Sequence, residues 1–211
     1  MSETTAGNGV CGVLLAGGLA RRMGGGDKCL RSLAGQPILA HAIARLRPQV
    51  DALVINANGD PARFADFSLP VVADVIEGFA GPLAGVLSGM TWARAHAPHC
   101  SHVVTVPTDA PFLPDDLVQR FQVALAEQGA ELACAASGGR AHPVCGLWPV
   151  SLEDDLRSAM ERDDIRKVDA GTARYRLAEV DWPSEPIDPF FNANRPEDLA
   201  TAETMIAATA R

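Results

Sequence analysis

Short apolar runs alternate with longer amphipathic stretches over the first 130 or so residues of the chain. The apolar runs have the length of buried strands, and the stretches between them have the length and periodicity of helices. The predicted strands are 10–15, 52–56, 71–73 and 103–107, and the predicted helices are 38–47, 61–67, 82–97 and 114–128. Pro82 and Pro114 stand where helices begin, because proline is tolerated in the first turn. This repeated order predicts a three-layer α/β fold with a doubly wound, mostly parallel sheet and helices on both faces.

The pattern becomes less regular in the second part of the chain. Residues 132–137 and 144–148 are predicted to be a strand pair joined by 138–143, and 175–180 a further strand. Helices are predicted at 152–162, 166–170 and 196–208, with a short strand or turn at 190–194. Residues 1–9 are polar and are predicted to be a disordered lead-in, and 10–211 to form a single domain.

Composition and charge narrow the class of protein. Of the 211 residues, 47% are apolar and 21% charged, which is ordinary for a globular protein, and no apolar run is long enough to cross a membrane. Five cysteines without paired spacing predict reduced thiols in the cytoplasm. The formal charge of −8 argues against nucleic-acid binding, although it leaves a nucleotide substrate open.

A glycine-rich loop follows the first predicted strand. Residues 17–26 hold five glycines and two adjacent arginines, and a lysine comes two residues later. Glycine leaves backbone N–H groups open to an anion, and open α/β sheets bind ligands at the carboxyl ends of their strands. The loop is therefore predicted to bind polyphosphate, with Arg21, Arg22 and Lys28 supplying charge. The predicted phosphate-binding backbone is Leu15, Ala16, Gly17 and Gly18.

Two common phosphate-binding motifs do not fit this loop. A P-loop needs Ser or Thr after its lysine, whereas Cys29 follows Lys28. The dinucleotide fingerprint Gly-x-Gly-x-x-Gly is broken, because Gly18 and Leu19 directly follow Gly17. The remaining alternative is a glycine-rich surface loop that binds nothing.

A carboxylate stands just beyond the strand predicted at 103–107. Asp109 lies in a loop bounded by Pro107 and Pro111. Magnesium prefers oxygen ligands and is usually held by one or two carboxylates together with substrate phosphates and water. Asp109 is therefore a candidate metal ligand. The alternative is a turn or helix-capping aspartate, although Asp115 is better placed to serve the helix predicted from 114.

Two further groups of polar residues are candidates for recognition of organic ligands. Asn56 follows the second predicted strand and Asp74 the third, and Gly81 opens the next predicted helix. Arg140 and His142 lie between the paired strands of the second part of the chain. Each of these residues could instead be an ordinary turn residue.

A pair of asparagines precedes the last predicted helix. Asn192 and Asn194 would point to the same side of an extended segment, because side chains alternate there. Two aligned amides suit a heterocycle that is rich in donors and acceptors. Alternatively, Asn194 caps the last helix.

These motifs together resemble a known family. Leu-Ala-Gly-Gly at 15–18, Arg-Arg-Met-Gly and Asp-Lys are similar to the signature of nucleotidyltransferases with a Rossmann-like doubly wound fold. Within that superfamily, Leu-Ala-Gly-Gly, Gly-Pro-Leu-Ala-Gly at 81–85, Arg-x-His-Pro at 140–143 and Asn-x-Asn-x-Pro-Glu-Asp-Leu at 192–199 resemble the molybdenum cofactor guanylyltransferases. The resemblance extends from Val10 to about Ala207.

The resemblance implies transfer of GMP from Mg·GTP to the terminal phosphate of molybdopterin, bare or loaded with molybdenum, with release of pyrophosphate. It implies a nucleotide-binding half of about 10–130 and a pterin-binding half of about 131–211. Implied partners are proteins that insert molybdenum and molybdoenzyme chaperones. The implied catalytic residues are Lys28, Asp109 and Arg22, with Asp109 also binding Mg²⁺. The implied nucleotide contacts beyond the loop are Asn56, Asp74 and Gly81, and the implied pterin contacts are Arg21, Arg140, His142, Asn192 and Asn194.

Several alternatives remain open from the sequence. A molybdopterin cytidylyltransferase, or another small enzyme that joins a nucleoside triphosphate to a phosphate, would share the phosphate loop. A regulatory nucleotide-binding module would lack turnover, and a sugar-1-phosphate nucleotidyltransferase usually has a further domain for which the chain has little room. The sequence has neither zinc-ligand spacing nor a Gly-x-Ser-x-Gly elbow, so direct attack on the α-phosphorus is expected.

Overall fold

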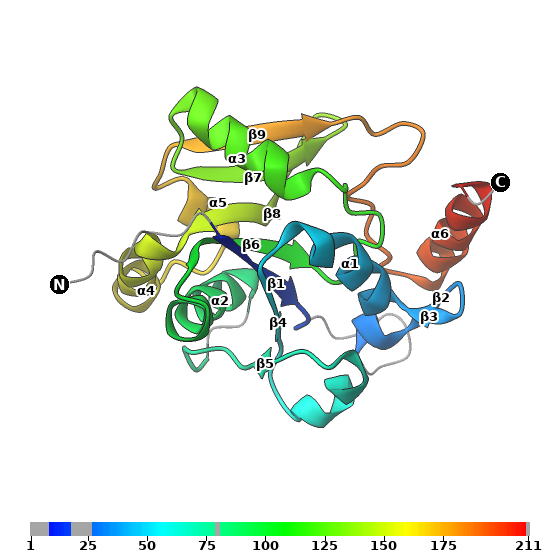
Figure 1. The fold of residues 1–211 in the computed structure, drawn as a ribbon, viewed down its shortest axis with the longest axis horizontal. Helices are drawn as coiled ribbons and strands as arrows, with labels where there is room; N and C mark the ends of the chain where they lie inside the picture. The colour runs from blue at the N-terminus through cyan, green and yellow to red at the C-terminus, as the bar shows by residue number, and fades with distance from the viewer. Residues whose placement is uncertain (1–8, 18–26, 79–80, 210–211) are drawn as a thin grey trace.

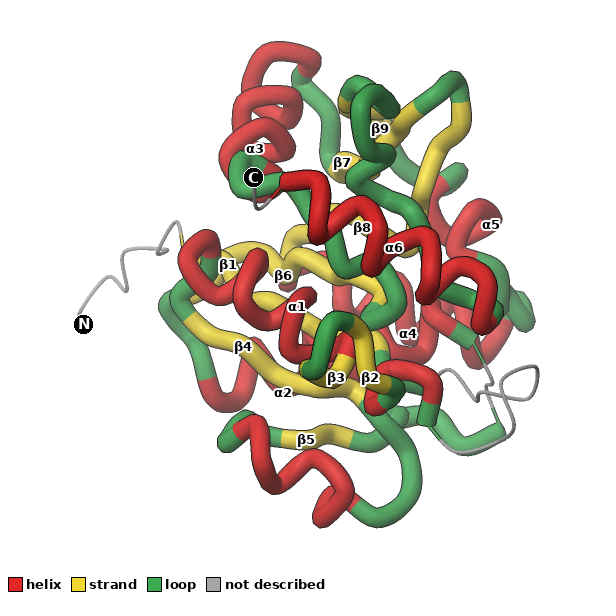
Figure 2. The backbone as a smooth tube through the Cα atoms, turned by 90° about the vertical axis from the view of Figure 1, so that its right-hand side faces the viewer, coloured by secondary structure: helices red, strands yellow, loops and turns green. Residues whose placement is uncertain are grey.

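A seven-stranded sheet forms the centre of the computed structural model, which describes residues 9–17, 27–78 and 81–209. The strand order is β5-β4-β1-β6-β8-β7-β9, and Figure 2 shows β5 at the outer edge beside β4. The pairings among β5, β4, β1 and β6 are parallel, as is that between β7 and β9, whereas β8 is antiparallel to both of its neighbours. The strands are β1 (Gly9–Leu15), β4 (Ala52–Asn56), β5 (Val71–Val72), β6 (Cys100–Pro107), β7 (Leu132–Ser137), β8 (Arg140–Pro149) and β9 (Leu177–Trp182).

Helices cover both faces of this sheet (Figure 1). One apolar core joins α1 (Ile38–Leu46) and α3 (Leu117–Gln128) to the strands. A second core on the opposite face holds α2 (Pro82–His96), α4 (Glu153–Arg162) and α5 (Val168–Thr172). The predicted three-layer, mostly parallel α/β fold is therefore confirmed.

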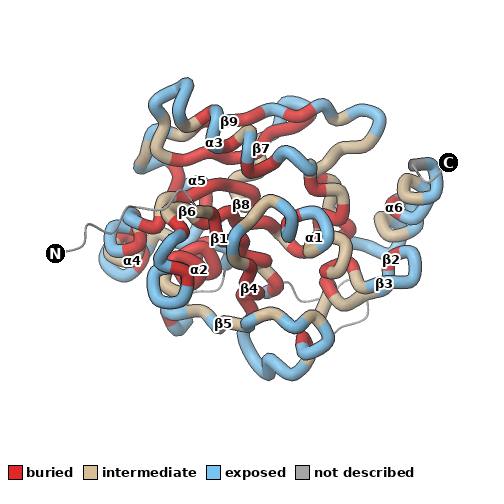
Figure 3. The backbone as a smooth tube through the Cα atoms, in the orientation of Figure 1, coloured by how far each residue is buried: buried red, intermediate tan, exposed pale blue. Residues whose placement is uncertain are grey.

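The first strand shows how the sequence builds these two cores. Val10 and Leu14 belong to the core under α1 and α3, whereas Cys11 and Val13 belong to the core under α2. Because successive side chains point to opposite faces, a strand buried on both sides reads as one continuous apolar run. Figure 3 shows this burial concentrated on the central strands.

The remaining elements lie around the ends of the strands. The last helix, α6 (Pro196–Thr209), packs on the hairpin of β2 (Ser32–Leu33) and β3 (Gln36–Pro37) through a small apolar cluster that includes Leu33 and Ala202. Figure 1 shows α6 and this hairpin on the side of the molecule away from α4. Short 3-10 helices are η2 (Lys28–Leu30), η3 (Arg47–Gln49), η4 (Pro61–Phe67) and η5 (Val150–Leu152).

Several predicted boundaries need correction. The helix expected at 166–170 lies at Val168–Thr172, and the strand expected at 103–107 already begins at Cys100. The helix expected from 114 begins at Leu117, because the carbonyl of Pro114 accepts from the Gln49 side chain and Asp115 pairs with Arg45. The strand expected at 175–180 is displaced to Leu177–Trp182. The β2–β3 hairpin was not predicted, since strands of two residues carry no readable alternation.

The connection predicted at 138–143 is wrong for most of its length. Only Gly138 and Gly139 form the turn, with φ values of +54° and +75°, as a two-residue type I′ hairpin requires. Arg140, Ala141, His142 and Pro143 already belong to β8. Arg140 and His142, the candidate ligand-binding residues, therefore lie on a strand, where side chains are held more firmly than in a loop.

A bulge in β8 then shapes the strand. Ala135 of β7 lies opposite His142, but the preceding residue, Cys134, lies opposite Gly146, so residues 143–145 bulge out of the ladder. Pro143 suits this position because it has no N–H to donate. The buried Thr105 donates its hydroxyl proton to the Val144 carbonyl at 2.8 Å and so supports the bulge from β6.

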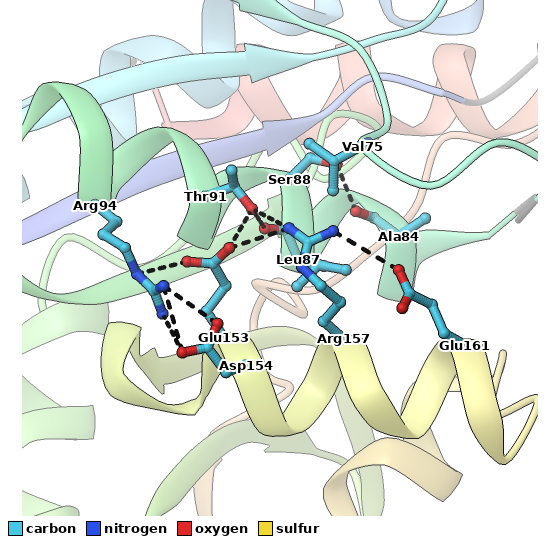
Figure 4. A network of polar contacts seen from close by, with 10 residues as sticks. All are labelled: Val75, Ala84, Leu87, Ser88, Thr91, Arg94, Glu153, Asp154, Arg157 and Glu161. Atoms are coloured by element: carbon cyan, nitrogen blue, oxygen red, sulfur yellow. Dashed lines mark hydrogen bonds and ion pairs between the residues drawn. The ribbon is translucent and has the colours of Figure 1, made fainter.

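A polar network ties α2 to α4 (Figure 4). The buried carboxylate of Glu153 accepts from the Thr91 hydroxyl at 2.8 Å and from Arg157 at 3.1 Å. Its other oxygen lies 2.6 Å from Nε of Arg94. Two guanidinium groups therefore balance one buried charge between these helices.

All five cysteines are free and buried, in agreement with the predicted reduced thiols. Burial raises the pKa of the Cys11 and Cys134 thiols to about 12. Among the described residues, no helix has both the length and the apolar character needed to cross a bilayer.

Candidate active site

A cavity of about 550 Å³ opens where the carboxyl ends of β1, β4 and β6 meet the first residues of β8. Parallel α/β sheets bind ligands at this edge. Because β8 runs antiparallel to β6, its beginning lies beside the end of β6 and faces the same edge. The cavity therefore joins residues from both halves of the chain.

Most of the predicted site residues line this one cavity. They are Leu15, Gly17, Lys28, Asn56, Asp74, Gly81, Asp109, Arg140, His142, Asn192 and Asn194. Ala16 does not, because its side chain is buried in the core and its N–H donates to the Asn56 carbonyl at 2.9 Å. Gly18, Arg21 and Arg22 lie outside the described residues.

Lys28 and Asp109 meet at the centre of the cavity. The Lys28 ammonium forms an ion pair with Oδ2 of Asp109 and donates to Oδ1 of Asn194. The Lys28 side chain is only 11% exposed, so its charge is largely enclosed by the protein. The N–H of Ala193 donates to the Asp109 carbonyl at 2.9 Å, which fixes Asn192 and Asn194 beside the carboxylate.

The other oxygen of Asp109 has a different environment. Its Oδ1 is buried and makes no hydrogen bond within the described part of the chain. A buried carboxylate oxygen without a partner is costly, and a hard cation is the ligand that most directly satisfies it. Among the described residues no group of three or more His, Cys, Asp or Glu side chains is arranged to hold a metal ion.

A second polar group lies where β4 and β5 end. The Asn56 amide donates to Oδ1 of Asp74 at 3.0 Å, and the Asn58 amide donates to Oδ2 at 2.8 Å. The side-chain Oδ1 of Asn58 accepts in turn from the backbone N–H of Asp74 at 2.8 Å. These bonds hold the Asp74 carboxylate in one orientation at the wall of the cavity.

Helix α2 approaches this group closely because of glycine. A Cβ on Gly85 would lie 2.4 Å from Oδ1 of Asn56 and 2.5 Å from Cδ2 of Leu15. Gly81, at the start of the same helix, has a φ of +150° that side chains with a Cβ rarely adopt. The motif at 81–85 thus allows α2 to pack directly against the residues that end β1 and β4.

An ion pair anchors the residue before Lys28. Nε of Arg63 lies 2.8 Å from Oδ2 of Asp27. The same guanidinium donates to the carbonyls of Asp60 at 2.8 Å and Asn58 at 2.6 Å. Arg63 therefore connects the Lys28 segment to the Asn58–Asp74 group.

The β8 side of the cavity is built from aromatic and polar groups. The His142 and Phe190 rings are 4.9 Å apart between centroids, and both line the cavity with Arg140 and Asn192. Burial lowers the pKa of His142, and the charge of Arg140 acts in the same direction, whereas Asp188 opposes it. Burial also raises the pKa of the Cys145 thiol well above its ordinary value, so this cysteine at the cavity wall stays protonated.

The capping alternatives do not describe this structure. The N-cap of α3 is Asp116, and Asp109 pairs with Lys28 instead. At the start of α6, Asp198 accepts from the backbone N–H groups of Asn194 and Arg195, both at 2.8 Å, while the Asn194 side chain contacts Lys28.

Sequence reasoning missed several residues that line the cavity. They are Ala57, Asn58, Pro82, Pro107, Thr108, Ala141, Pro143, Val144, Cys145 and Phe190. Asn58 carried a signal, since it repeats the asparagine two positions earlier at a strand end. Phe190 carried none, because an isolated aromatic residue gives no indication of what it contacts.

The chain is similar to known proteins over nearly its whole length. The family model of the MobA-like NTP transferase domain matches residues 12–178. A molybdenum cofactor guanylyltransferase from Rhodopseudomonas palustris (strain BisB5) is 59% identical over 94% of this chain and 95% of its own length. One from Bradyrhizobium sp. (strain ORS 278) is 58% identical over 98% and 96%.

A solved structure has the same fold. The crystal structure of molybdopterin-guanine dinucleotide biosynthesis protein A from Archaeoglobus fulgidus superposes with a TM-score of 0.72, at 20% identity, over 94% of this chain and 99% of that one. Taken with the sequence relatives, which match nearly end to end, these findings show that the chain belongs to the MobA-like NTP transferases and, within them, to the molybdenum cofactor guanylyltransferase family.

Proposed function

We propose that the protein transfers GMP from GTP to the terminal phosphate of molybdopterin, releasing pyrophosphate and forming the guanine dinucleotide cofactor. The observation that carries the proposal is the single cavity in which the Lys28–Asp109 pair lies between two different recognition groups. Membership of the guanylyltransferase family supports the same reaction.

The nucleotide is proposed to bind on the side formed by β1, β4 and β5. The oriented Asp74 carboxylate and the Asn56 and Asn58 amides offer acceptors and donors to a base and its ribose. Leu15 and Gly17 begin the glycine loop, where backbone N–H groups suit the triphosphate. Of the predicted loop, Gly18 and Arg22 remain expectations, as does Arg21 for the pterin side.

Mg²⁺ is proposed to be held by Asp109. The buried, unpartnered Oδ1 of this residue and the adjoining phosphate site fit a hard cation. When bound, such an ion neutralises phosphate charge and orients the reacting phosphoryl group. We propose magnesium as this metal, and the experiment below compares it with manganese.

The chain's own groups then account for the transfer. A phosphate oxygen of the second substrate attacks the α-phosphorus of GTP, a new P–O bond forms, and the bond to the β-phosphate breaks. Lys28 is placed to stabilise the negative charge on the departing pyrophosphate. Because burial raises the pKa of the Cys145 thiol, this cysteine at the cavity wall is a poor nucleophile.

The second substrate is proposed to occupy the side formed by β8 and the segment around Asn192. Arg140 suits its phosphate, and His142, Asn192 and Asn194 suit a pterin rich in hydrogen-bonding groups. This assignment divides the chain into a nucleotide-binding half of about 10–130 and a pterin-binding half of about 131–211.

Product analysis tests the proposal. Purified protein is incubated with Mg²⁺ or Mn²⁺, with either GTP or CTP, and with either molybdopterin or a hexose 1-phosphate as acceptor, and pyrophosphate and the nucleotide product are measured. Pyrophosphate and a guanine dinucleotide with GTP alone are expected. A cytosine product would indicate the cytidylyltransferase, and a product with a hexose 1-phosphate would indicate a sugar enzyme. Nucleotide binding without pyrophosphate release in any mixture would indicate a regulatory module.

Further proposals concern the cellular setting. Proteins that insert molybdenum and molybdoenzyme chaperones are proposed as partners, since the product is a cofactor that has to be delivered. Five free cysteines support work in a reducing compartment, for which we propose the cytoplasm.

A further inference from the structure

A chain of two hydrogen bonds runs from the cavity wall into the protein beneath His142. Nε2 of His142 lies 2.8 Å from the hydroxyl oxygen of Ser137, and this hydroxyl lies 2.8 Å from Oδ1 of Asp188. Ser137 ends β7 and is 2% exposed, so water does not replace either bond. None of these contacts was expected from the sequence, because neither Ser137 nor Asp188 belongs to a recognised motif.

The direction of each bond follows from the proton count. An ionised carboxylate only accepts, so the single hydroxyl proton of Ser137 goes to Asp188. The serine oxygen can then only accept from the ring, and Nε2 of His142 has to carry a proton. The neutral imidazole has one N–H, and its other nitrogen, Nδ1, is left as an acceptor.

This arrangement differs from a nucleophilic triad. In a triad the histidine takes the serine proton and the carboxylate holds the histidine. Here the serine lies between the other two and donates a hydrogen bond to the carboxylate, which also accepts from the Phe190 N–H at 2.9 Å. Ser137 therefore acts on the histidine and does not attack a substrate.

The acceptor nitrogen is the one available to a ligand. His142 lines the cavity, and Nδ1 makes no hydrogen bond to any residue in the described ranges. The Phe190 ring, tilted by 31° to the imidazole at a centroid distance of 4.9 Å, helps to fix the plane of the imidazole. The ring is also kept neutral, because burial lowers the pKa of His142 and Arg140 adds to this effect, against the opposing charge of Asp188.

We propose that Ser137 and Asp188 are positioning residues that hold His142 as the Nε2–H tautomer, so that Nδ1 accepts a hydrogen bond from an N–H group of the second substrate's heterocycle. The ligand part of this inference rests on the proposed function. The tautomer part does not, because it follows from the contacts alone. A ring that presented N–H at this place would favour a heterocycle carbonyl, so the tautomer decides which edge of the ligand is accepted.

Two matched variants separate this role from simple packing. Ser137→Ala removes the acceptor for Nε2–H and releases the tautomer. Asp188→Asn is the control: its amide oxygen is expected to stay at the Oδ1 position, because the Phe190 N–H there needs an acceptor. That variant keeps the serine proton directed away from the histidine while removing the charge. Asp188→Ala, which removes the acceptor, is a second disrupting variant.

The primary measurement is the ¹⁵N NMR tautomer pattern of His142 in the ligand-free protein, well above the ordinary pKa of imidazole. The signals are assigned by their loss in His142→Gln. The Nε2–H form is expected in the wild type and in Asp188→Asn, with a shift toward Nδ1–H in Ser137→Ala and Asp188→Ala. An Nδ1–H wild type, or an unchanged tautomer in both disrupting variants, would overturn the inference whether or not the protein transfers GMP.

Kinetics test the ligand part. Ser137→Ala is expected to raise the KM for the pterin phosphate about tenfold, with GTP affinity unchanged, whereas Asp188→Asn stays within about twofold of wild type. Equal pterin KM values in Ser137→Ala and wild type would remove the ligand role and leave the tautomer result standing. Absence of transfer by the wild type itself would instead refute the proposed function.

Discussion

At the scale of single residues, the two carboxylates of the site differ in how completely their oxygens are paired. Lys28 and Asp109 neutralise one another, yet one oxygen of Asp109 stays buried without a hydrogen-bond partner within the described residues. Asp74, in contrast, has both oxygens engaged by asparagine amides. The Lys28–Asp109 pair is therefore suited to forming new contacts with a bound substrate or cation. The Asp74 carboxylate is suited to keeping one orientation.

Lys28→Ala is expected to lower kcat/KM about a hundredfold or more, because a preorganised positive charge at the leaving group is lost. The matched control is Lys167→Ala, since Lys167 is the chain's only other lysine and is exposed at the start of α5. Steady-state kinetics and thermal melting of both variants check the result. Activity of Lys28→Ala within a factor of two of wild type would refute its catalytic role.

Asp109→Asn is expected to lower the rate and to raise the magnesium concentration needed for half-maximal activity. An amide oxygen is a poorer ligand for a hard cation than a carboxylate. The measurement is activity across a magnesium titration, with Asp115→Asn as control because its side chain is 77% exposed and pairs with Arg45 at the surface. An unchanged midpoint and rate would assign Asp109 a structural role.

At the scale of elements, α2 approaches the sheet closely at the carboxyl ends of β1 and β4. Gly85 lies against Asn56 and Leu15, and Gly89, one turn later, lies against Val13. The motif at 81–85 was readable from the sequence, but the partner of each glycine was not. These contacts depend on how closely, and in which position, α2 packs on the sheet. The local sequence pattern does not determine either.

Gly85→Ala is expected to destabilise the protein by about 1–3 kcal/mol, because the added Cβ forces side chains apart. It should also weaken GTP binding by displacing Asn56. Gly89→Ala, whose Cβ would lie 2.5 Å from Cγ2 of Val13, is the matched comparison with a similar fall in Tm and nearly normal GTP affinity. Equal GTP affinities in the two variants would contradict a link between α2 and the nucleotide.

Glu153→Gln is expected to lower the free energy of unfolding by about 1–3 kcal/mol, because the hydrogen bond from Thr91 and the ion pair with Arg94, which join α2 to α4, are weakened. The control is Asp154→Asn, whose side chain is 79% exposed, so its ion pair with Arg94 contributes little. Denaturant unfolding of both variants is the measurement. Equal midpoints would show that the buried carboxylate gives α4 no net stabilisation.

At the scale of the whole molecule, the sequence predicted the architecture better than it predicted the contacts within the site. The apolar runs and proline positions located almost every strand and helix, because a sheet buried on both faces leaves long, unambiguous signals. The bulge after His142 could not be read, since it depends on pairing between β7 and β8 and on support from Thr105. The roles of Ser137 and Asp188 could not be predicted either. Their hydrogen bonds form only because the fold places the end of β7 beside the segment before Phe190.

The common cavity leads to a prediction about the two substrates. Asp74→Ala should weaken GTP binding by roughly tenfold or more, because a lost hydrogen bond to a buried group costs about 1–3 kcal/mol. Asn192→Ala should leave GTP binding nearly unchanged and raise the KM for the pterin phosphate instead. Calorimetry with GTP compares the two variants directly. Equal damage to GTP affinity would mean that both residues contact the nucleotide.

The turn that opens β8 has a consequence for how substrate preference can change. Gly138 and Gly139 are exposed, and the strand after them carries Arg140 and His142 into the cavity. Residues inserted at this turn would extend outward, while the pairing of β8 with β6 holds the remainder of the strand in register. The hairpin is therefore a suitable place for inserting loops of varied sequence. Such insertions are expected to change which acceptor molecule is bound and to leave nucleotide binding unchanged.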